Sequence, residues 1–298
     1  MNYRILGNSN LDISEIGFGC MSLGDSTADN ISLVHKALDK GINFFDTADL
    51  YQHGQNEAQL GKALEGRRED AIIATKVGNQ WKSDGSGWVW NTNKDYILKA
   101  VEESLRRLKT DYIDLYQLHG GTMEDPVDDI IETFELLQQQ GKIRYYGISS
   151  IRPNVIREYV KRSNITSVMM QYSLLDRRPE ESMLPLLNTE HIGLLVRGAI
   201  AKGLLAGKPA EPYFNYKEEE IRAAANTVAS LSGPERSSAQ TALRFVLEQP
   251  MVSSAVVGIR TLPQLEEVAG VSDTPMLTAA GIQMLRNALA VNYYDQYR

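Results

Sequence analysis

The sequence is poor in features that would place it outside the cytoplasm. It has a single cysteine, Cys20, among 298 residues, so no disulfide can form within the chain. It has no run of about 18 apolar residues, the length that spans a bilayer, and its first residues, MNYRILGNSN, lack the apolar segment of a secretory signal. These absences predict a cytoplasmic protein with no membrane partner, whose fold does not depend on an oxidising compartment.

Basic residues are outnumbered by acidic residues. Lys and Arg number 31 against 38 Asp and Glu, which gives a formal net charge of −7. The basic pairs Arg67-Arg68, Arg106-Arg107 and Arg177-Arg178 each lie beside acidic residues. Nucleic-acid binding needs clustered Lys and Arg, so no nucleic-acid partner is expected. The four histidines show no paired ligand spacing, and no metal site is predicted.

Short apolar runs alternate with longer amphipathic segments along the chain. Eight runs are predicted to be strands: 16–21, 42–47, 71–77, 113–119, 145–149, 167–172, 192–198 and 254–258. Helical spacing of apolar residues predicts helices over 94–108 and 126–140. Such alternation implies parallel strands joined by right-handed crossovers. A doubly wound sheet is possible, but eight units in 298 residues favour a closed (β/α)₈ barrel.

The chain contains no linker and no low-complexity stretch, so we predict one domain over residues 1–298. A short antiparallel pair around Gly7-Asn8 is expected to cap the bottom of the barrel. Two helical runs, 217–231 and 237–249, are predicted to form an insertion between the seventh and eighth strands.

Polar residues stand at the predicted C-terminal ends of consecutive strands, where barrels of this kind place their catalytic groups. These are Asp46, Lys76 and His119, with Tyr51 in the loop after Asp46. Singly, each has a structural explanation: helix capping for the aspartate, an ion pair for the lysine and core packing for the histidine. Four such groups converging on one end of a barrel are better explained by catalysis.

The chemistry of this set is coherent. A tyrosine hydroxyl has a pKa of about 10, and an adjacent ammonium stabilises its phenolate. An aspartate keeps the lysine charged, and a histidine orients a carbonyl oxygen. Such a site protonates a carbonyl oxygen as hydride reaches the carbon. Because it cannot supply hydride, a redox cofactor is required.

The sequence resembles the aldo-keto reductases from residue 2 to about residue 270. The resemblance is carried, in chain order, by RILGNSNLDISEIGFGCMSLG, GINFFDTADLYQHGQNEAQLGKAL, IIATKVG, LKTDYIDLYQLH, GKIRYYGISS and VMMQYSLLDR. It implies an NADP(H)-dependent oxidoreductase that reduces aldehydes and ketones to alcohols. The implied tetrad is Asp46, Tyr51, Lys76 and His119, with Tyr51 as the proton donor.

The resemblance also implies NADPH extended across the barrel mouth. It assigns Gly19, Cys20, Met21 and Asp46 to the ribose–nicotinamide end, Ser149, Ser150 and Gln171 to the carboxamide, Arg197, Gly198, Ile200, Lys202, Gly203 and Leu204 to the pyrophosphate belt, and Gly258, Arg260, Gln264 and Glu267 to the adenosine phosphate. Arg197 stands where the family often has an aromatic residue, and its guanidinium plane could stack in the same way. Arg260 is left to bind the 2′-phosphate with only Gln264 beside it, so the expected preference for NADPH over NADH is mild.

The three tryptophans, Trp81, Trp88 and Trp90, follow Lys76 within one loop. Structurally, they could tether this loop to the barrel. Functionally, they could wall an apolar substrate pocket, and we favour this interpretation because such pockets favour aromatic linings. Cys20 is expected to pack and not to act as a nucleophile, because nothing nearby in the sequence would lower its pKa.

Two other classes of protein fit the sequence less well. A non-catalytic nicotinamide-nucleotide sensor, like the channel β subunits that share the fold and the tetrad, usually has an N-terminal extension, whereas here the cap begins at residue 2. A barrel enzyme acting on phosphorylated sugars would need no tetrad of this kind. The sequence therefore favours an enzyme whose partner is a small carbonyl substrate.

Overall fold

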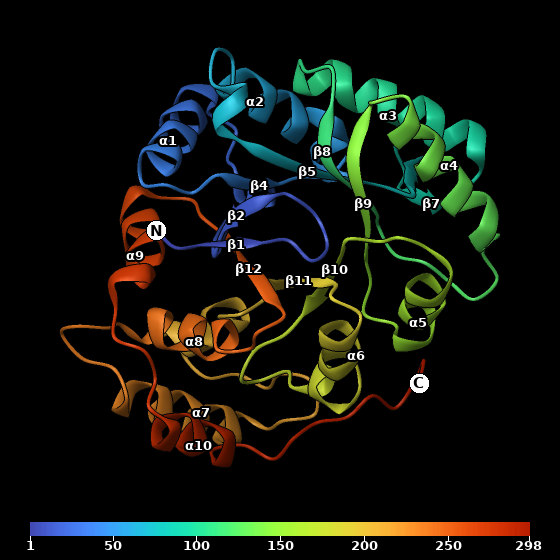
Figure 1. The fold of residues 1–298 in the computed structure, drawn as a ribbon. Helices are drawn as coiled ribbons and strands as arrows, with labels where there is room; N and C mark the ends of the chain where they lie inside the picture. The colour runs from blue at the N-terminus through green and yellow to red at the C-terminus, as the bar shows by residue number, and fades with distance from the viewer.

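The computed structural model describes residues 1–298 and contains a closed eight-stranded parallel barrel (Figure 1). Its strands are β3 (Ile16–Gly19), β4 (Phe44–Asp46), β5 (Ile72–Val77), β8 (Ile113–Leu118), β9 (Ile143–Ser149), β10 (Ser167–Gln171), β11 (Gly193–Arg197) and β12 (Val252–Gly258). They are arranged in chain order, and β12 pairs with β3 to close the circle. The predicted barrel is confirmed, and each strand end lies within two residues of its predicted position.

Helices surround the barrel in the end-on view of Figure 1. They are α1 (Thr27–Asp39), α2 (Gln55–Ala63), α3 (Lys94–Leu108), α4 (Val127–Gln139), α5 (Pro153–Arg162), α6 (Met183–Thr189), α7 (Glu218–Ser230), α8 (Ser238–Leu247), α9 (Leu262–Ala269) and α10 (Ala279–Asn287). In α3, the apolar residues Ile97, Val101, Leu105 and Leu108 are buried, as their helical spacing predicts. The predicted helices between the last two strands are α7 and α8. None of the helices is both long and apolar enough to cross a membrane.

A hairpin at the start of the chain closes the N-terminal end of the barrel. It consists of β1 (Tyr3–Ile5) and β2 (Asp12–Ser14), as predicted. Its side chains Leu6, Leu11 and Ile13 are fully buried. They form one cluster with residues that line the barrel interior, namely Phe44, Ala74, Leu115, Met169, Leu195 and Val256. The cap therefore fills the floor of the barrel with apolar side chains.

The cap is also bonded to the last strand of the barrel. The Arg4 guanidinium donates a hydrogen bond to the Val252 carbonyl oxygen at 2.8 Å. The Ala255 amide donates to the Glu15 carbonyl oxygen at 2.8 Å. The N-terminal hairpin is thus joined to the last barrel strand at the barrel floor.

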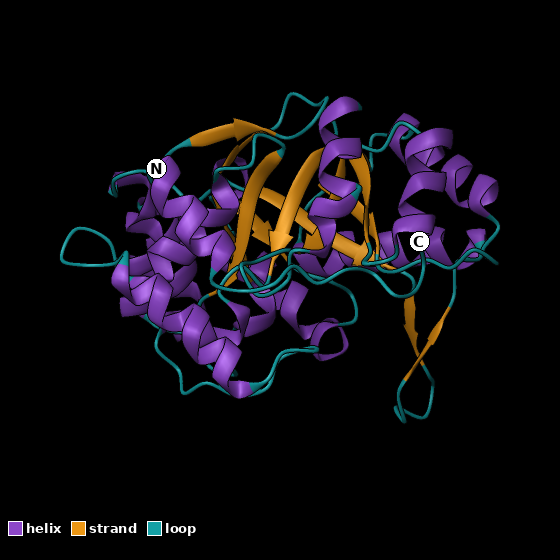
Figure 2. Cartoon of the chain, turned by 90° about the horizontal axis from the view of Figure 1, so that it is seen from below, coloured by secondary structure: helices purple, strands orange, loops and turns teal.

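The segment after β5 is a second hairpin and not the loop that was predicted. It pairs β6 (Asn79–Trp81) with β7 (Trp88–Trp90), and Trp81 stands opposite Trp88. Figure 2 shows it projecting away from the barrel. Because β6 begins directly after β5 ends, the hairpin belongs to the C-terminal mouth of the barrel. Tryptophan favours strands, and here this preference outweighs the preference of the surrounding glycine and serine residues for loops.

Candidate active site

An ion pair lies at the C-terminal ends of two neighbouring strands. Lys76, on β5, donates from Nζ to Asp46 Oδ1 at 2.6 Å, and both side chains are buried. Burial raises the pKa of Asp46, and the Lys76 ammonium opposes this rise. Burial alone would lower the pKa of Lys76, but the charge on Asp46 and the Tyr51 oxygen raise it above its usual value. Lys76 is therefore protonated at neutral pH.

The same ammonium reaches the Tyr51 hydroxyl. Lys76 Nζ lies 3.3 Å from Tyr51 Oη and also donates to the Thr47 carbonyl oxygen at 2.7 Å. Immediately after Tyr51, Gln52 and His53 adopt left-handed backbone conformations with φ of 49° and 54°. Such conformations are costly for residues other than glycine and are concentrated at functional sites. They turn the chain sharply and leave Tyr51 beside Lys76.

His119 follows β8 and faces Tyr51, with the two ring centroids 5.9 Å apart in an edge-on arrangement. Burial lowers the pKa of His119 to about 3, and the charges of Lys76 and Arg197 add to this effect. The imidazole is therefore neutral at neutral pH. Its Nδ1 is buried without a hydrogen-bond partner. A proton on Nε2 avoids burying an unpaired N–H donor, so we assign the Nε2–H tautomer.

Two supporting residues were missed from the sequence. Gln117, on β8, is fully buried and donates from Nε2 to Asp46 Oδ2 at 3.2 Å. Asn79 donates from Nδ2 to the His119 carbonyl oxygen at 3.0 Å. Gln117 stands two residues before His119 on one strand, and residues at this spacing share a face. The alternation of β8 could therefore have revealed it.

The residues assigned to the nicotinamide end lie at the ends of β3, β9 and β10. Gly19 ends β3, Met21 is exposed and Cys20 is buried. Burial raises the pKa of the Cys20 thiol, and the Asp46 carboxylate raises it further, so the cysteine packs and is not a poised nucleophile. Ser149 ends β9, and Ser150, the next residue, is buried.

Gln171 ends β10 and has both ends of its amide engaged. It donates from Nε2 to the Tyr213 hydroxyl at 2.7 Å and accepts from Arg197 Nη1 at 3.2 Å. Tyr213 was not identified from the sequence, because it lies 42 residues away in the insertion. Nothing in the local pattern relates the two positions.

The segment assigned to the pyrophosphate follows β11. Gly198 has a φ of +74°, and a Cβ there would lie 3.2 Å from Gln171 Cγ. Left-handed conformations recur at Ala201, Lys202 and Gly203. Ile200 and Leu204 belong to the same irregular turn, in which Ile200 is partly buried and Leu204 is buried. Lys202 is exposed.

The segment assigned to the adenosine phosphate follows β12. Gly258 ends the strand, and Arg260 is exposed and forms no ion pair with an acidic side chain. The Arg260 amide donates to Gln264 Oε1 at 2.9 Å, which ties the loop to the first turn of α9. Glu267 Oε1 accepts from Ser237 Oγ at 2.7 Å, so this carboxylate also links α9 to the start of α8.

The three tryptophans have different environments. Trp81 donates from Nε1 to the Leu50 carbonyl oxygen at 3.1 Å and stacks on His53 with centroids 3.6 Å apart. Trp90 donates to Asp125 Oδ1 at 2.7 Å and anchors the hairpin. Trp88 is half exposed. His53 is exposed, and Trp81 covers one face of its ring.

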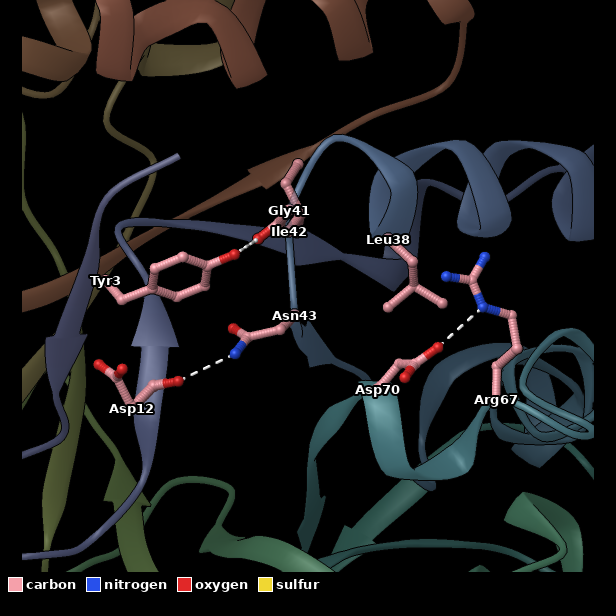
Figure 3. Close-up of a pocket in the computed structure, with 8 residues that line it drawn as sticks. All are labelled: Tyr3, Asp12, Leu38, Gly41, Ile42, Asn43, Arg67 and Asp70. Carbon is pink, nitrogen blue, oxygen red and sulfur yellow. Dashed lines mark hydrogen bonds and ion pairs between the residues drawn. The ribbon is translucent and has the colours of Figure 1, made fainter.

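A cavity of about 430 Å³ lies at the other end of the molecule, against the cap (Figure 3). Its walls carry Tyr3, Asp12, Asn43, Arg67 and Asp70. Arg67 is already paired with Asp70 and Asp39, each at 2.9 Å. The floor of such barrels serves stability, so we do not assign the cavity to the candidate active site.

The fold and these residues define an oxidoreductase class, and the comparisons agree. The chain belongs to the aldo/keto reductase family, whose model matches residues 15–290. It is 48% identical to the "Uncharacterized oxidoreductase YqkF" of Bacillus subtilis over 100% of both chains.

Solved structures show the same relationship. The holo form of aldo-keto reductase AKR11C1 from Bacillus halodurans superposes with a TM-score of 0.95, at 48% identity over 100% of this chain and 99% of that one. The apo form of the same enzyme gives 0.86, at 45% identity over the same shares of the two chains. The comparisons support an oxidoreductase and do not favour the non-catalytic subunit weighed from the sequence.

Proposed function

We propose that this chain reduces aldehyde and ketone carbonyls to alcohols with NADPH, and that Tyr51 is the proton donor. The observation that carries the proposal is the buried Lys76 ammonium, which contacts Asp46 at 2.6 Å and the Tyr51 hydroxyl at 3.3 Å. An ion pair explains the burial of Lys76 beside Asp46, whereas the phenol and the neutral histidine next to them are explained by proton transfer.

The residues at the mouth fit a nicotinamide nucleotide. Arg197, at the end of β11, and Lys202 and Arg260, on the loops after β11 and β12, are exposed cations. Each would pair with a phosphate or stack on a ring. A side chain at Gly198 would require Gln171 to shift and a left-handed backbone with φ of +74°, so glycine is favoured at this turn. The greater similarity to the holo form than to the apo form of AKR11C1 supports a backbone already shaped for the cofactor. When bound, the nicotinamide supplies hydride to the carbonyl carbon.

Residues of this chain carry out the proton transfer. Tyr51 donates its hydroxyl proton to the carbonyl oxygen, and the Lys76 ammonium stabilises the charge that develops on the phenolate. Asp46 keeps Lys76 in place, and Gln117 holds the other carboxylate oxygen. Neutral His119 donates from Nε2–H to the same carbonyl oxygen and orients it. Charged groups enclosed in this way act more strongly than they do in water.

The test is Tyr51→Phe, which removes the donor and keeps the ring. Carbonyl reduction should fall by about 10²–10⁴-fold, the usual contribution of general acid catalysis, while NADPH binding persists. Steady-state NADPH oxidation against aldehydes, ketones and dicarbonyls measures the first quantity, and fluorescence titration measures the second. Turnover close to wild type with tight cofactor binding would refute the mechanism.

We further propose that at least one of the hairpin tryptophans lines the substrate pocket. Trp81 supports this most directly, because it contacts Leu50, the residue next to Tyr51. We also propose that residues 1–298 form one domain and that the protein is cytoplasmic.

A further inference from the structure

The loop that carries Tyr51 contains a second carboxylic acid, Asp49, that the mechanism does not use. Its amide donates to the Lys76 carbonyl oxygen at 3.4 Å, so the loop is bonded to the end of β5. Its neighbour Leu50 accepts the Trp81 indole N–H at 3.1 Å. Asp49 thus stands where the Tyr51 loop is joined to the barrel and to the hairpin.

The side chain of Asp49 is incompletely bonded. Oδ2 accepts from the Tyr96 hydroxyl of α3 at 3.3 Å, whereas Oδ1 is enclosed and has no hydrogen-bond partner. An enclosed carboxylate oxygen without a donor is costly when charged, because it has lost its hydration. The neutral acid is favoured in this place.

The charges around Asp49 come from three elements. Glu57 of α2 is fully buried and accepts from Arg107 Nε of α3 at 2.6 Å. Tyr96 is also on α3, and the buried hydroxyl of Tyr116, on β8, has no partner. Arg107 therefore neutralises Glu57 and is only partly available to Asp49.

The balance of these groups favours protonation. Burial raises the pKa of Asp49 to about 7, and the Glu57 carboxylate contributes to the rise. Arg107, the Leu50 backbone amide and the Tyr96 hydroxyl lower the pKa of Asp49, but their effect is weaker than that of burial.

We propose that Asp49 is a positioning residue for Tyr51, and that its neutral form holds the Tyr51 loop in the arrangement that donates a proton. Ionisation places a charge beside Glu57 on an oxygen without a donor, and the loop relaxes away from this arrangement. Because Tyr51 must meet the carbonyl oxygen at hydrogen-bond distance, relaxation of the loop lowers kcat. The inference rests on the proposed reductase function.

The central experiment compares kcat for wild type and Asp49→Asn across the range from about pH 5.5 to about pH 8.5. The amide copies the shape of the neutral acid and cannot ionise. Any other titrating group changes kcat of both proteins alike, so its effect cancels in the ratio of wild-type kcat to variant kcat. The ratio should be near one at the acidic end and fall by about tenfold as the pH rises through 7, since a 1 Å misplacement can cost about 100-fold. A ratio that stays flat overturns the proposal.

Two further variants sharpen the result. Tyr96→Phe removes the hydroxyl that donates to Asp49 Oδ2 and should move the fall in kcat to higher pH. Asp84→Asn is the matched control, because Asp84 is exposed between β6 and β7 and the Ser86 amide lowers its pKa. It is charged over the whole range, so its ratio should be flat. A fall in the Asp84→Asn ratio like that for Asp49→Asn would overturn the proposal.

Two readouts need no turnover and separate this proposal from the proposed function. A carboxyl whose pKa is raised on folding costs stability as the pH rises from its ordinary value of 3.8 to about 7. The thermal midpoint of Asp49→Asn should therefore rise relative to wild type over that interval and then level off. The fluorescence of Trp81, identified by comparison with Trp81→Phe, should change across neutral pH in wild type and not in Asp49→Asn.

If no carbonyl is reduced at any pH, the proposed function fails, and the fluorescence decides whether Asp49 controls the loop. If the midpoints titrate but neither kcat nor the Trp81 signal follows, Asp49 titrates without positioning Tyr51, and the proposal is wrong.

Discussion

Arg260 provides a quantitative test of cofactor choice. NADPH differs from NADH by a 2′-phosphate, which an arginine binds with charge-assisted, bidentate hydrogen bonds. Arg260 has no acidic partner to compete for its charge, and its loop is held independently by the bond from the Arg260 amide to Gln264. Replacing the side chain should therefore leave the backbone in place. We predict that Arg260→Ala weakens NADPH binding and leaves NADH binding nearly unchanged.

The magnitude follows from the exposure of the site. A hydrogen bond to a charged group contributes about 1.5–3 kcal/mol, and about 1.4 kcal/mol corresponds to tenfold in affinity. Because Arg260 is exposed and screened by solvent, the lower end applies, and the expected loss is about tenfold. Lys202, by contrast, is assigned to the pyrophosphate common to both cofactors, so Lys202→Ala should weaken both equally.

Fluorescence titration of NADPH and NADH against wild type and Arg260→Ala measures this effect. Arg222→Ala is the control, because Arg222 is an exposed arginine of α7 that is already paired with Glu218. The difference between the cofactors should shrink at high ionic strength, since salt screens exposed charges. Equal losses for NADPH and NADH in Arg260→Ala would show that this residue does not recognise the 2′-phosphate.

Two further outcomes are expected. Arg107→Ala removes the partner of the fully buried Glu57 and should lower the free energy of unfolding by about 3–5 kcal/mol. Denaturant unfolding measures this loss, and Arg106→Ala, at an exposed position of the same helix, is the near-neutral control. Equal losses in the two variants would contradict a stabilising role for the Arg107–Glu57 pair. Alanine at each hairpin tryptophan should raise KM for carbonyl substrates more than the Kd for NADPH, most clearly at Trp81, and unchanged KM values in all three variants would exclude them from the pocket.

The barrel could be predicted because most of its strands are short apolar runs buried on both faces. The proximity of Asp46, Lys76 and His119 followed from the same pattern, since the ends of parallel strands meet at one edge of a barrel. The hairpin at Asn79–Trp90 escaped prediction because its strands have three residues each, too few to establish an alternation. Its glycines and serines are also typical of loops.

The partners of the site residues were harder to predict. The bond from Gln171 to Tyr213 spans 42 positions, and the bond from Tyr96 to Asp49 spans 47. Such pairs depend on where whole helices and strands lie in space. The local periodicity of apolar residues contains no information about this arrangement. The unpartnered Oδ1 of Asp49 is a property of packing alone, so only the structure could reveal it.

The cap has a consequence for the order of events during synthesis. Its apolar side chains pack against Leu195 and Val256, which come much later in the sequence, and its residues Arg4 and Glu15 are hydrogen-bonded to Val252 and Ala255. The floor of the barrel therefore cannot close until β12 has been synthesised. Until then Leu6, Leu11 and Ile13 have no partner surface, and contacts between such distant segments form slowly.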